Sequence, residues 1–432
     1  MKFISTSGRA PAADLASALL AGLAPDGGLY VPESIPRLSV PAFDSTTTLP
    51  QVAAVLLRPF FEGDALSAHL DSICASSLNI ETPLVTIAEG ASLLEVFHGP
   101  TAAFKDYGAR FLANALARIR PPTPGDPPLI ILVATSGDTG SAVAAAFHRR
   151  PGFQVVILYP EGRVSKRQAH QLGSFGDNVL ALRVEGAFDL CQAMVKQAFG
   201  DEDLRARLPL SSANSISLGR LLPQASYYAF AALRHFRATG RPLSFIVPTG
   251  NLGNAVAALI ARSLGLPIGR VLLATNRNPT IPEFLATGEY RRRESVSTIA
   301  NAMDVGDPSN MARLRFMMAA DPEIARAIAA LSVDDETIGA RIKAGESGYG
   351  KVLCPHTACG MEMLEDQRRR GAGEDFCVVA TAHPAKFDDV VEPLVGHAIE
   401  PPEALRLMLE RKAVSEPIEP GAAALKARLL RL

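Results

Sequence analysis

The sequence lacks tryptophan, has few cysteines and contains no long apolar run. Its 432 residues include only five cysteines. Because that number is odd and the cysteines are scattered, they indicate reduced thiols rather than a disulfide framework. The longest purely apolar strings, such as residues 129–134, are far too short to cross a bilayer, and the N-terminus turns polar directly after Phe3 and Ile4. These features predict a cytoplasmic protein without a membrane anchor.

A surplus of either charge is also missing. The formal net charge is −1 at pH 7, so the chain has no field that would hold a nucleic-acid backbone or an anionic membrane. Two arginine triplets, Arg291–Arg293 and Arg368–Arg370, are interpreted as exposed helix faces. The segment CPHTAC, from Cys354 to Cys359 around His356, has the wrong gap for zinc and lacks a fourth ligand, so no metal site is expected.

What the chain does contain is typical of an α/β enzyme. Hydrophobic residues make up 48% of it, and 34 glycines and 32 prolines supply many tight connections. A length of 432 residues exceeds what one hydrophobic core usually serves. Two packed units are therefore expected.

One lysine stands at a position with unusual electrostatics. In the stretch LLEVFHGPTAAFKDYGARFLA, apolar residues recur at helical spacing after Lys105, until Pro121 and Pro122 end the run. Lys105 is therefore expected in the first turn of a helix. There the positive end of the helix dipole disfavours a cation and lowers the pKa of the amine, which favours a neutral nucleophile. A solvated, idle lysine is the ordinary alternative for any single residue of this kind.

A strand–helix–strand unit follows. Residues 129–134 and 154–159 are apolar runs of strand length, and an alanine-rich helix is expected over 141–150. The polar loop Thr135–Gly140 lies at the carboxyl end of the first strand, where parallel sheets usually bind ligands. Its N–H and hydroxyl donors suit an anion such as a carboxylate. Neither G-x-G-x-x-G nor a Walker lysine occurs there, which argues against a nucleotide-binding protein.

The same pattern repeats further along the chain. Residues 244–247 predict a strand, PTGNLGN (Pro248–Asn254, the glycine loop) predicts a connection, and 255–264 predict a helix. Gly250 and Gly253 lack a Cβ and let backbone N–H groups approach a phosphate at the helix N-terminus. Tight turns also need glycine for packing alone, so this signal is not specific by itself.

A hydroxyl also stands at a strand end. The apolar run CVVAT (Cys377–Thr381) predicts a strand that delivers the Thr381 hydroxyl at its carboxyl end. An amine, an anion-binding loop and a hydroxyl are what pyridoxal 5'-phosphate (PLP) requires: Lys105 for the imine, the glycine loop for the phosphate and Thr381 for the pyridine nitrogen. The residues alone thus support a PLP site as a hypothesis.

Seven segments resemble, in order, the signatures of the threonine synthase family of the bacterial and fungal type: FHGPTAAFKDYGARF, ATSGDTGSA, SSANSISLGRLLPQASYY, PTGNLGN, ATNRNPTIPEF, NAMDVGDPSN and TAHPAKF. The resemblance implies a fold-type II PLP enzyme, with an α/β fold like that of tryptophan synthase β. Two parallel-sheet α/β domains and an N-terminal segment are expected. The division would be 1–100 for the N-terminal segment packing on the large domain, 101–225 for a small mobile domain and 226–432 for the large PLP-binding domain.

The resemblance also implies roles for individual residues. Lys105 would be the catalytic lysine that forms a Schiff base with PLP. The other cofactor-binding residues would be Gly250, Asn251, Leu252, Gly253, Asn254, Thr381 and Asn214. Ser136, Asp138 and Thr139 resemble the loop that receives the substrate carboxylate. Arg163, Asn301 and Asp304 are candidates for closing on the substrate.

The reaction implied by the resemblance is that of a carbon–oxygen lyase acting on phosphate. O-phospho-L-homoserine and water would give L-threonine and phosphate, the last step of threonine biosynthesis. Lys105 would move protons at Cα and Cβ, and the small domain would close to exclude water. This small substrate is the expected partner, without nucleic acid or membrane, for a monomer or a homodimer. Two alternatives stay open: a related phospho-lyase that ends at a 2-oxo acid, and a non-catalytic PLP-binding homologue.

Overall fold

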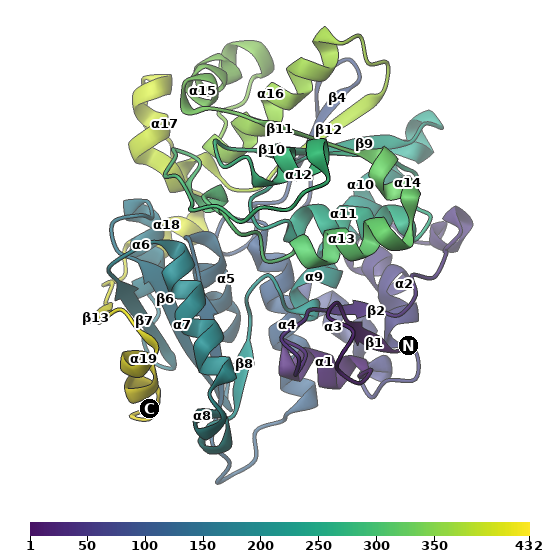
Figure 1. Cartoon of the computed structure of the whole chain (residues 1–432). Coiled ribbons are helices and arrows are strands. Elements are labelled where there is room, and N and C mark those ends of the chain that lie inside the picture. Colours follow the sequence, from purple (N-terminus) through teal and green to yellow (C-terminus); the bar gives the residue numbers. More distant parts are fainter.

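Two sheets flanked by helices organise the chain in this computed structural model, which describes residues 1–432 (Figure 1). The six strands of the larger sheet, in spatial order, are β11 (Ile328–Ser332), β10 (Ile268–Thr275), β9 (Leu243–Pro248), β12 (Asp375–Ala380), β4 (Ala91–Glu95) and β3 (Leu84–Ala88). Five of them are parallel, and only the edge strand β3 runs antiparallel. The central strands are buried on both faces, which explains why their sequences are continuous apolar runs.

The smaller sheet has five parallel strands. In spatial order they are β13 (Glu416–Ile418), β7 (Val179–Val184), β6 (Phe153–Pro160), β5 (Leu129–Ala134) and β8 (Leu210–Ser212). A separate antiparallel pair near the N-terminus joins β1 (Phe3–Ser5) to β2 (Tyr30–Pro32). The parallel-sheet α/β architecture expected from the sequence is confirmed.

The helices complete the layers. Before the smaller sheet come α1 (Leu15–Ala21), α2 (Leu49–Phe61), α3 (Leu70–Ser77) and α4 (Lys105–Ile119). Among the strands of the smaller sheet and after them lie α5 (Asp138–Phe147), α6 (Lys166–Gly173), α7 (Phe188–Gly200), α8 (Glu202–Arg207), α9 (Leu218–Leu221) and α10 (Ala225–Thr239). The later helices are α11 (Gly253–Ser263), α12 (Thr280–Thr287), α13 (Met311–Ala320), α14 (Pro322–Ala327), α15 (Asp335–Tyr349), α16 (Pro355–Arg369), α17 (Asp388–Val395), α18 (Glu403–Leu409) and α19 (Ala422–Leu429). No helix is both long enough and apolar enough to span a bilayer.

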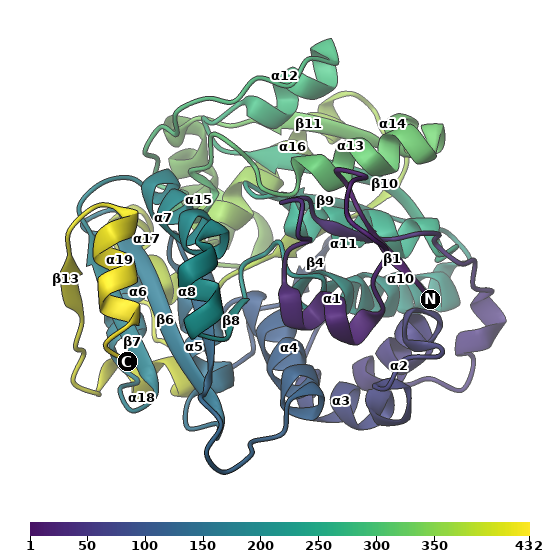
Figure 2. The ribbon, with the colours of Figure 1, turned by 60° about the horizontal axis from the view of Figure 1, so that its bottom comes forward.

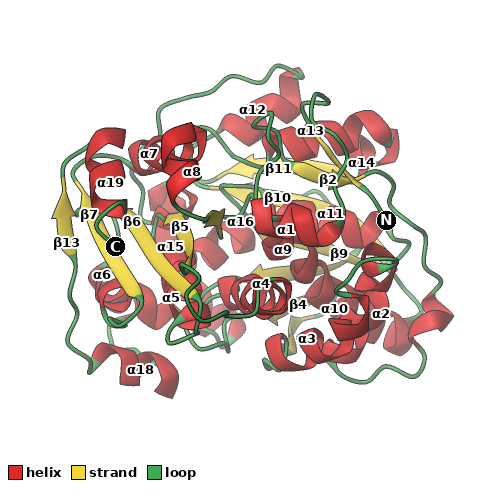
Figure 3. Cartoon of the chain, turned by 90° about the horizontal axis from the view of Figure 1, so that it is seen from below, coloured by secondary structure: helices red, strands yellow, loops and turns green.

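Successive side chains along the larger sheet point to opposite faces and pack against two different layers of helices. In β9, Phe245 and Val247 belong to the cluster that contains α10 and α11, whereas Ile246 belongs to the cluster that contains α16. The smaller sheet is covered by α5 on one face and by α7 and α19 on the other. Because the first of these clusters also takes in α4, α5 and β5, it runs continuously from one sheet to the other. In Figure 3, α4 lies between the two sheets.

Two sequence interpretations need correction. The sequence assigned all of 226–432 to the large domain, but β13 pairs with β7 and α19 packs on α7, so the end of the chain belongs to the smaller sheet (Figure 2). The rest of the predicted domain division stays a prediction. Arg291–Arg293 lie in an irregular segment after α12 rather than on a helix face, whereas Arg368 and Arg369 do end α16.

The position of α19 leads to a stability prediction. Leu425 lies on the buried face of this helix, in the same cluster as Ile130 and Phe188, whereas Leu432 is 49% exposed. Leu425→Ala should lower the free energy of unfolding by about 2–5 kcal/mol, because it leaves a cavity in that cluster. Leu432→Ala should change it by less than about 0.5 kcal/mol. Urea unfolding of both variants measures the difference, and equal effects would show that α19 does not belong to this core.

Candidate active site

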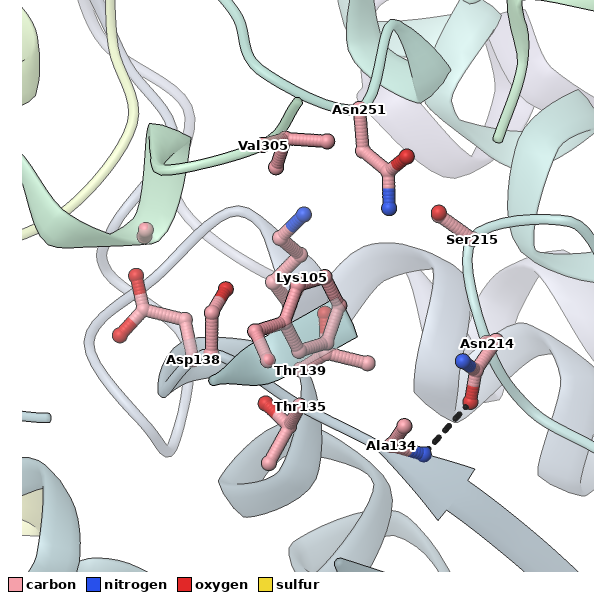
Figure 4. Close-up of a pocket in the computed structure, with 12 residues that line it drawn as sticks. Lys105, Ala134, Thr135, Asp138, Thr139, Asn214, Ser215, Asn251 and Val305 are labelled. Carbon is pink, nitrogen blue, oxygen red and sulfur yellow. Dashed lines mark hydrogen bonds between the residues drawn. The ribbon is translucent and has the colours of Figure 1, made fainter. Parts of the chain in front are cut away.

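The carboxyl ends of strands from both sheets surround one cavity (Figure 4). The cavity is lined by Lys105, Ala134, Thr135, Ser136, Asp138, Thr139, Phe188, Asn214, Ser215, Asn251, Ala302 and Val305. Six of the residues singled out in the sequence are therefore brought together here: Lys105, Ser136, Asp138, Thr139, Asn214 and Asn251. They come from the start of α4 and from the loops that follow β5, β8 and β9.

Lys105 is the first residue of α4, as the sequence predicts. The pKa of its amine is lowered from 10.5 to about 7, first by burial and then by the positive charge of Arg220, against an opposing effect of Asp138. The direction of this shift agrees with the sequence argument, but its main cause is burial rather than the helix dipole. A substantial fraction of the amine is therefore neutral near pH 7.

Arg220 is a residue that the sequence reasoning missed. It is fully buried, and its Nη1 donates to the carbonyl oxygen of Ala213 at 2.6 Å. Its Nε and Nη2 have no partner in the protein, and no carboxylate lies within ion-pair distance. A buried cation without a counterion raises the local positive potential, which suits a site for anions. The only signal in the sequence was one arginine at the entry to an otherwise apolar helical run.

The glycine loop connects β9 to α11. Leu252 caps α11 with a φ of 61°, a left-handed conformation that a leucine adopts only under constraint. A Cβ at Gly250 would lie 2.7 Å from Cα of Met303, so packing alone explains that glycine. A Cβ at Gly253 would meet no atom closer than 3.4 Å, an ordinary contact. Packing therefore does not require glycine at 253, whereas the close approach of an anion to the helix N-terminus does.

Asn254 faces the interior instead of the cavity. Its Oδ1 accepts hydrogen bonds from the hydroxyls of Tyr227 and Tyr228, and its Nδ2 is buried without a partner. Any contribution of Asn254 to phosphate binding would therefore come from its backbone N–H. Asn251 does reach the cavity, and its Oδ1 accepts a hydrogen bond from the backbone N–H of Ser309 at 2.6 Å.

Thr381 lies directly beside the start of α4. Its carbonyl oxygen accepts a hydrogen bond from the backbone N–H of Phe104 at 2.9 Å, and Ala382 forms a bridge with Ala103. Main-chain hydrogen bonds thus hold the end of β12 next to the residues that precede Lys105. Asn214 lies across the cavity, where its Oδ1 accepts a hydrogen bond from the backbone N–H of Ala134 at 3.1 Å (Figure 4).

The β5–α5 loop presents donors of two kinds. Ser136 and Thr139 line the cavity, and α5 begins at Asp138, so the free N–H groups of its first turn lie at this loop. The Asp138 carboxylate is not free, because Oδ1 accepts from Gln168 Nε2 and from Lys386 Nζ, both at 2.9 Å. Burial alone would raise the pKa of this carboxyl, but Lys386 and His356 hold it below its usual value. A substrate carboxylate would be bound by the N–H and hydroxyl groups of this loop and not by the Asp138 side chain.

Three predicted closing residues lie outside the cavity lining. Arg163 is exposed. Asn301 begins the 3₁₀-helix η4 (Asn301–Met303), and its Nδ2 donates to Gln168 Oε1 at 3.0 Å, while its Oδ1 is buried without a partner. Asp304 accepts hydrogen bonds from Thr298 Oγ1 and Asn276 Nδ2, both at 2.7 Å. Burial raises the pKa of its carboxyl to about 7. Because of these hydrogen bonds and its absence from the cavity lining, Asp304 is interpreted as holding the η4 segment in place.

The arrangement as a whole fits PLP. A partly neutral lysine stands at the edge of the cavity, and the glycine loop, whose Gly253 is not required by packing, begins a helix beside it. Thr381 is bonded to the residue before that lysine, and the buried Arg220 lacks a counterion. PLP needs an amine, a phosphate site and a partner for its ring nitrogen. Fold and site together define a fold-type II PLP enzyme.

Comparison with known proteins identifies the family. The family described as pyridoxal-phosphate dependent enzyme matches residues 76–382, threonine synthase N terminus matches 2–78, and threonine synthase, C-terminal matches 357–428. The threonine synthase of Escherichia coli K12 is 38% identical over 418 residues, which cover 96% of each chain. The chain belongs to the threonine synthase family, and its cofactor is pyridoxal 5'-phosphate.

Solved structures agree with this assignment. The crystal structure of threonine synthase from Escherichia coli matches with a TM-score of 0.93 and 35% identity, covering 100% of both chains. A PLP-bound threonine synthase from Brucella melitensis matches with a TM-score of 0.88 and 34% identity, covering 100% of this chain and 99% of the other. The likeness therefore extends over both sheets and the N-terminal segment.

The lowered pKa of Lys105 predicts a specific pH dependence. A lysine is acylated only as the neutral amine, so acetylation of Lys105 in the apoenzyme should rise with pH with a midpoint at about pH 7. Arg220→Met removes a charge that lowers this pKa, so it should move the midpoint upward. Competitive labelling with acetic anhydride, read by peptide mass spectrometry, gives the midpoint. Arg234→Met, an exposed arginine, is the control. A midpoint near 10 in the unmodified protein would contradict the burial argument.

Gly253 gives a second test of the site. Because a Cβ fits there in the protein itself, Gly253→Ala should leave the thermal unfolding of the apoenzyme nearly unchanged. The same methyl group would occupy the space over the helix N-terminus, so PLP affinity should fall by at least about tenfold, or 1.4 kcal/mol. Titration of apoenzyme with PLP measures this. Gly348→Ala in α15, where a Cβ meets nothing within 4 Å, is the control. Unchanged affinity in Gly253→Ala would remove the glycine loop from the phosphate site.

Proposed function

We propose that this chain is a threonine synthase that converts O-phospho-L-homoserine and water to L-threonine and phosphate, the last step of threonine biosynthesis. The observation that carries the proposal is the meeting of the Lys105 amine with the β5–α5 loop and the glycine loop at one cavity. The family relation supports the choice of reaction. We place the activity in the cytoplasm, since all five cysteines are buried free thiols.

Each group of residues in the site has a separate proposed role. Lys105 is the proposed Schiff-base lysine and the base that moves protons at Cα and Cβ of the substrate, because its amine is neutral in part near pH 7. Bound PLP supplies an electron sink for the carbanion formed when a proton leaves. The backbone of Gly250–Asn254 would hold the cofactor phosphate, and the Thr381 hydroxyl would serve as the partner of the ring nitrogen. Asn214, which lines the cavity, would contribute to binding the ring.

The substrate is held from the opposite side of the cavity. The N–H groups at the start of α5 and the hydroxyls of Ser136 and Thr139 bind its carboxylate. The uncompensated charge of Arg220 lowers the pKa of Lys105, so it favours the base form of the lysine. Phe188, Ala302 and Val305 form an apolar part of the wall and exclude water from the reacting atoms. Asn301 and Arg163 would close on the substrate. Asp304 would contribute indirectly, by holding the η4 segment that carries Asn301.

The function is tested by measuring products together. Purified holoenzyme should release phosphate and L-threonine from O-phospho-L-homoserine in equal amounts. Lys105→Ala should lower turnover by about 10²–10⁴-fold or more, since one group serves as nucleophile and base, and borohydride should no longer fix PLP to the chain. Lys343→Ala, an exposed lysine of α15, is the control. Phosphate with 2-oxobutyrate and no threonine would assign the related phospho-lyase activity instead, and PLP binding without phosphate release would assign a non-catalytic homologue.

A further inference from the structure

A buried ion pair behind the cavity wall joins the two sheets. Lys386, in the 3₁₀-helix η5 (Pro384–Phe387) that follows β12, has no exposed surface, and Asp138 is 5% exposed. Lys386 Nζ lies 2.9 Å from Asp138 Oδ1 and donates a hydrogen bond to the carbonyl oxygen of Thr101 at 2.7 Å. Thr101 belongs to the segment that leads into Lys105. One ammonium group therefore contacts two of the segments that form the site while being absent from the cavity lining.

Gln168 extends this connection to η4. Its Nε2 donates to Asp138 Oδ1 at 2.9 Å, and its Oε1 accepts from Asn301 Nδ2 and from the backbone N–H of Ser165, each at 3.0 Å. Gln168 also lies against the loop, because a Cβ at Gly137 would come 2.5 Å from its Nε2. We call the four side chains Lys386, Asp138, Gln168 and Asn301 the closing network.

Helix α6 docks on the segment that carries Lys386. Ser165 Oγ donates to the carbonyl oxygen of Lys386 at 2.7 Å, and Arg167 Nη1 donates to the carbonyl oxygen of Ala385 at 2.6 Å. Arg167 Nε also pairs with Asp388 at 3.1 Å. The smaller sheet thus contributes α6, and the larger sheet contributes η5 and the start of α17, to a single contact.

The energetics of burial make this contact all-or-none. A buried ion pair is stable only if each charge keeps its partner and its hydrogen bonds, because an unpaired buried charge is strongly unfavourable. Separating α6 from η5 would remove Gln168 and admit water to the Asp138–Lys386 pair. The orientation of the β5–α5 loop is therefore tied to the docking of α6, although the two are different elements.

We propose that Lys386 is a positioning residue, which fixes the β5–α5 loop through Asp138 when α6 is docked and so prepares the loop to bind the substrate carboxylate. This inference rests on the proposed function only for the identity of the substrate. The coupling between Lys386, the loop and α6 is independent of the proposed function. Nothing in the proposal places Lys386 in contact with the reacting atoms.

The test uses full-length holoenzyme carrying Lys386→Met, which keeps the length of the side chain without its charge. PLP should stay attached to Lys105. Hydrogen exchange should become faster by at least about tenfold in residues 135–140 and 165–173 and in the segment of Thr101, and not over the rest of either sheet, because these segments lose their common partner. KM for O-phospho-L-homoserine should rise by about 10- to 100-fold, with a smaller change in kcat. Lys426→Met, which removes a lysine paired with Asp201 in the same unit, should change neither quantity.

A second variant keeps the proposal testable if Lys386→Met does not fold. Arg167→Met removes the contact of α6 with Asp388 and leaves the Asp138–Lys386 pair intact. It should give the same local pattern of exchange and a smaller rise in KM. If the variant that folds has KM and exchange within about twofold of the unmodified protein, the proposal is overturned. Faster exchange spread evenly over both sheets would also overturn it, since that result describes a purely stabilising ion pair.

The exchange measurement separates this inference from the proposed function. It requires no turnover, so it gives an answer even if the protein makes no threonine. Local exchange changes in a protein without threonine synthesis would refute the proposed function and leave the coupling standing. Threonine synthesis without a local change in exchange would refute the coupling and leave the proposed function standing.

Discussion

The buried amine of Lys105 sets the conditions under which this site can be built. Burial lowers its pKa to about 7, and Arg220 contributes in the same direction. Withdrawing an ammonium group from water is costly, so the site must be built where several elements converge and where the neutral form is acceptable. The start of α4 meets that requirement because α4 lies in the buried cluster that runs from one sheet to the other.

The two sheets contribute different functions to that site. The larger sheet supplies main-chain structure: the glycine loop after β9, and Thr381, whose carbonyl oxygen accepts a hydrogen bond from the backbone N–H of Phe104. The smaller sheet supplies the β5–α5 loop, whose orientation depends on α6 and on the buried Asp138–Lys386 pair. A site divided in this way can hold a cofactor firmly on one side while the other side closes on a substrate.

Three features that are unfavourable without a bound ligand lie near the cavity. Arg220 has two unpartnered nitrogens, and Asn301 has a buried oxygen without a partner. Leu252 has a left-handed backbone conformation at the glycine loop. Such features destabilise the protein when nothing is bound, and they persist where the bound groups relieve them. Their clustering at one place is consistent with a site for an anionic cofactor and an anionic substrate.

The local structure of the site could be predicted from the sequence. The strand at 129–134, the glycine loop and the first-turn position of Lys105 all follow from apolar periodicity and from glycine and proline placement, which act within a few residues. Only the tertiary structure decided which distant groups share the interior. The burial of Arg220 without a counterion, the Asp138–Lys386 pair and the addition of β13 to the smaller sheet depend on packing between segments far apart in the chain. A local pattern carries no information about such partners, because a buried charge is settled by the whole set of neighbours that exclude water from it.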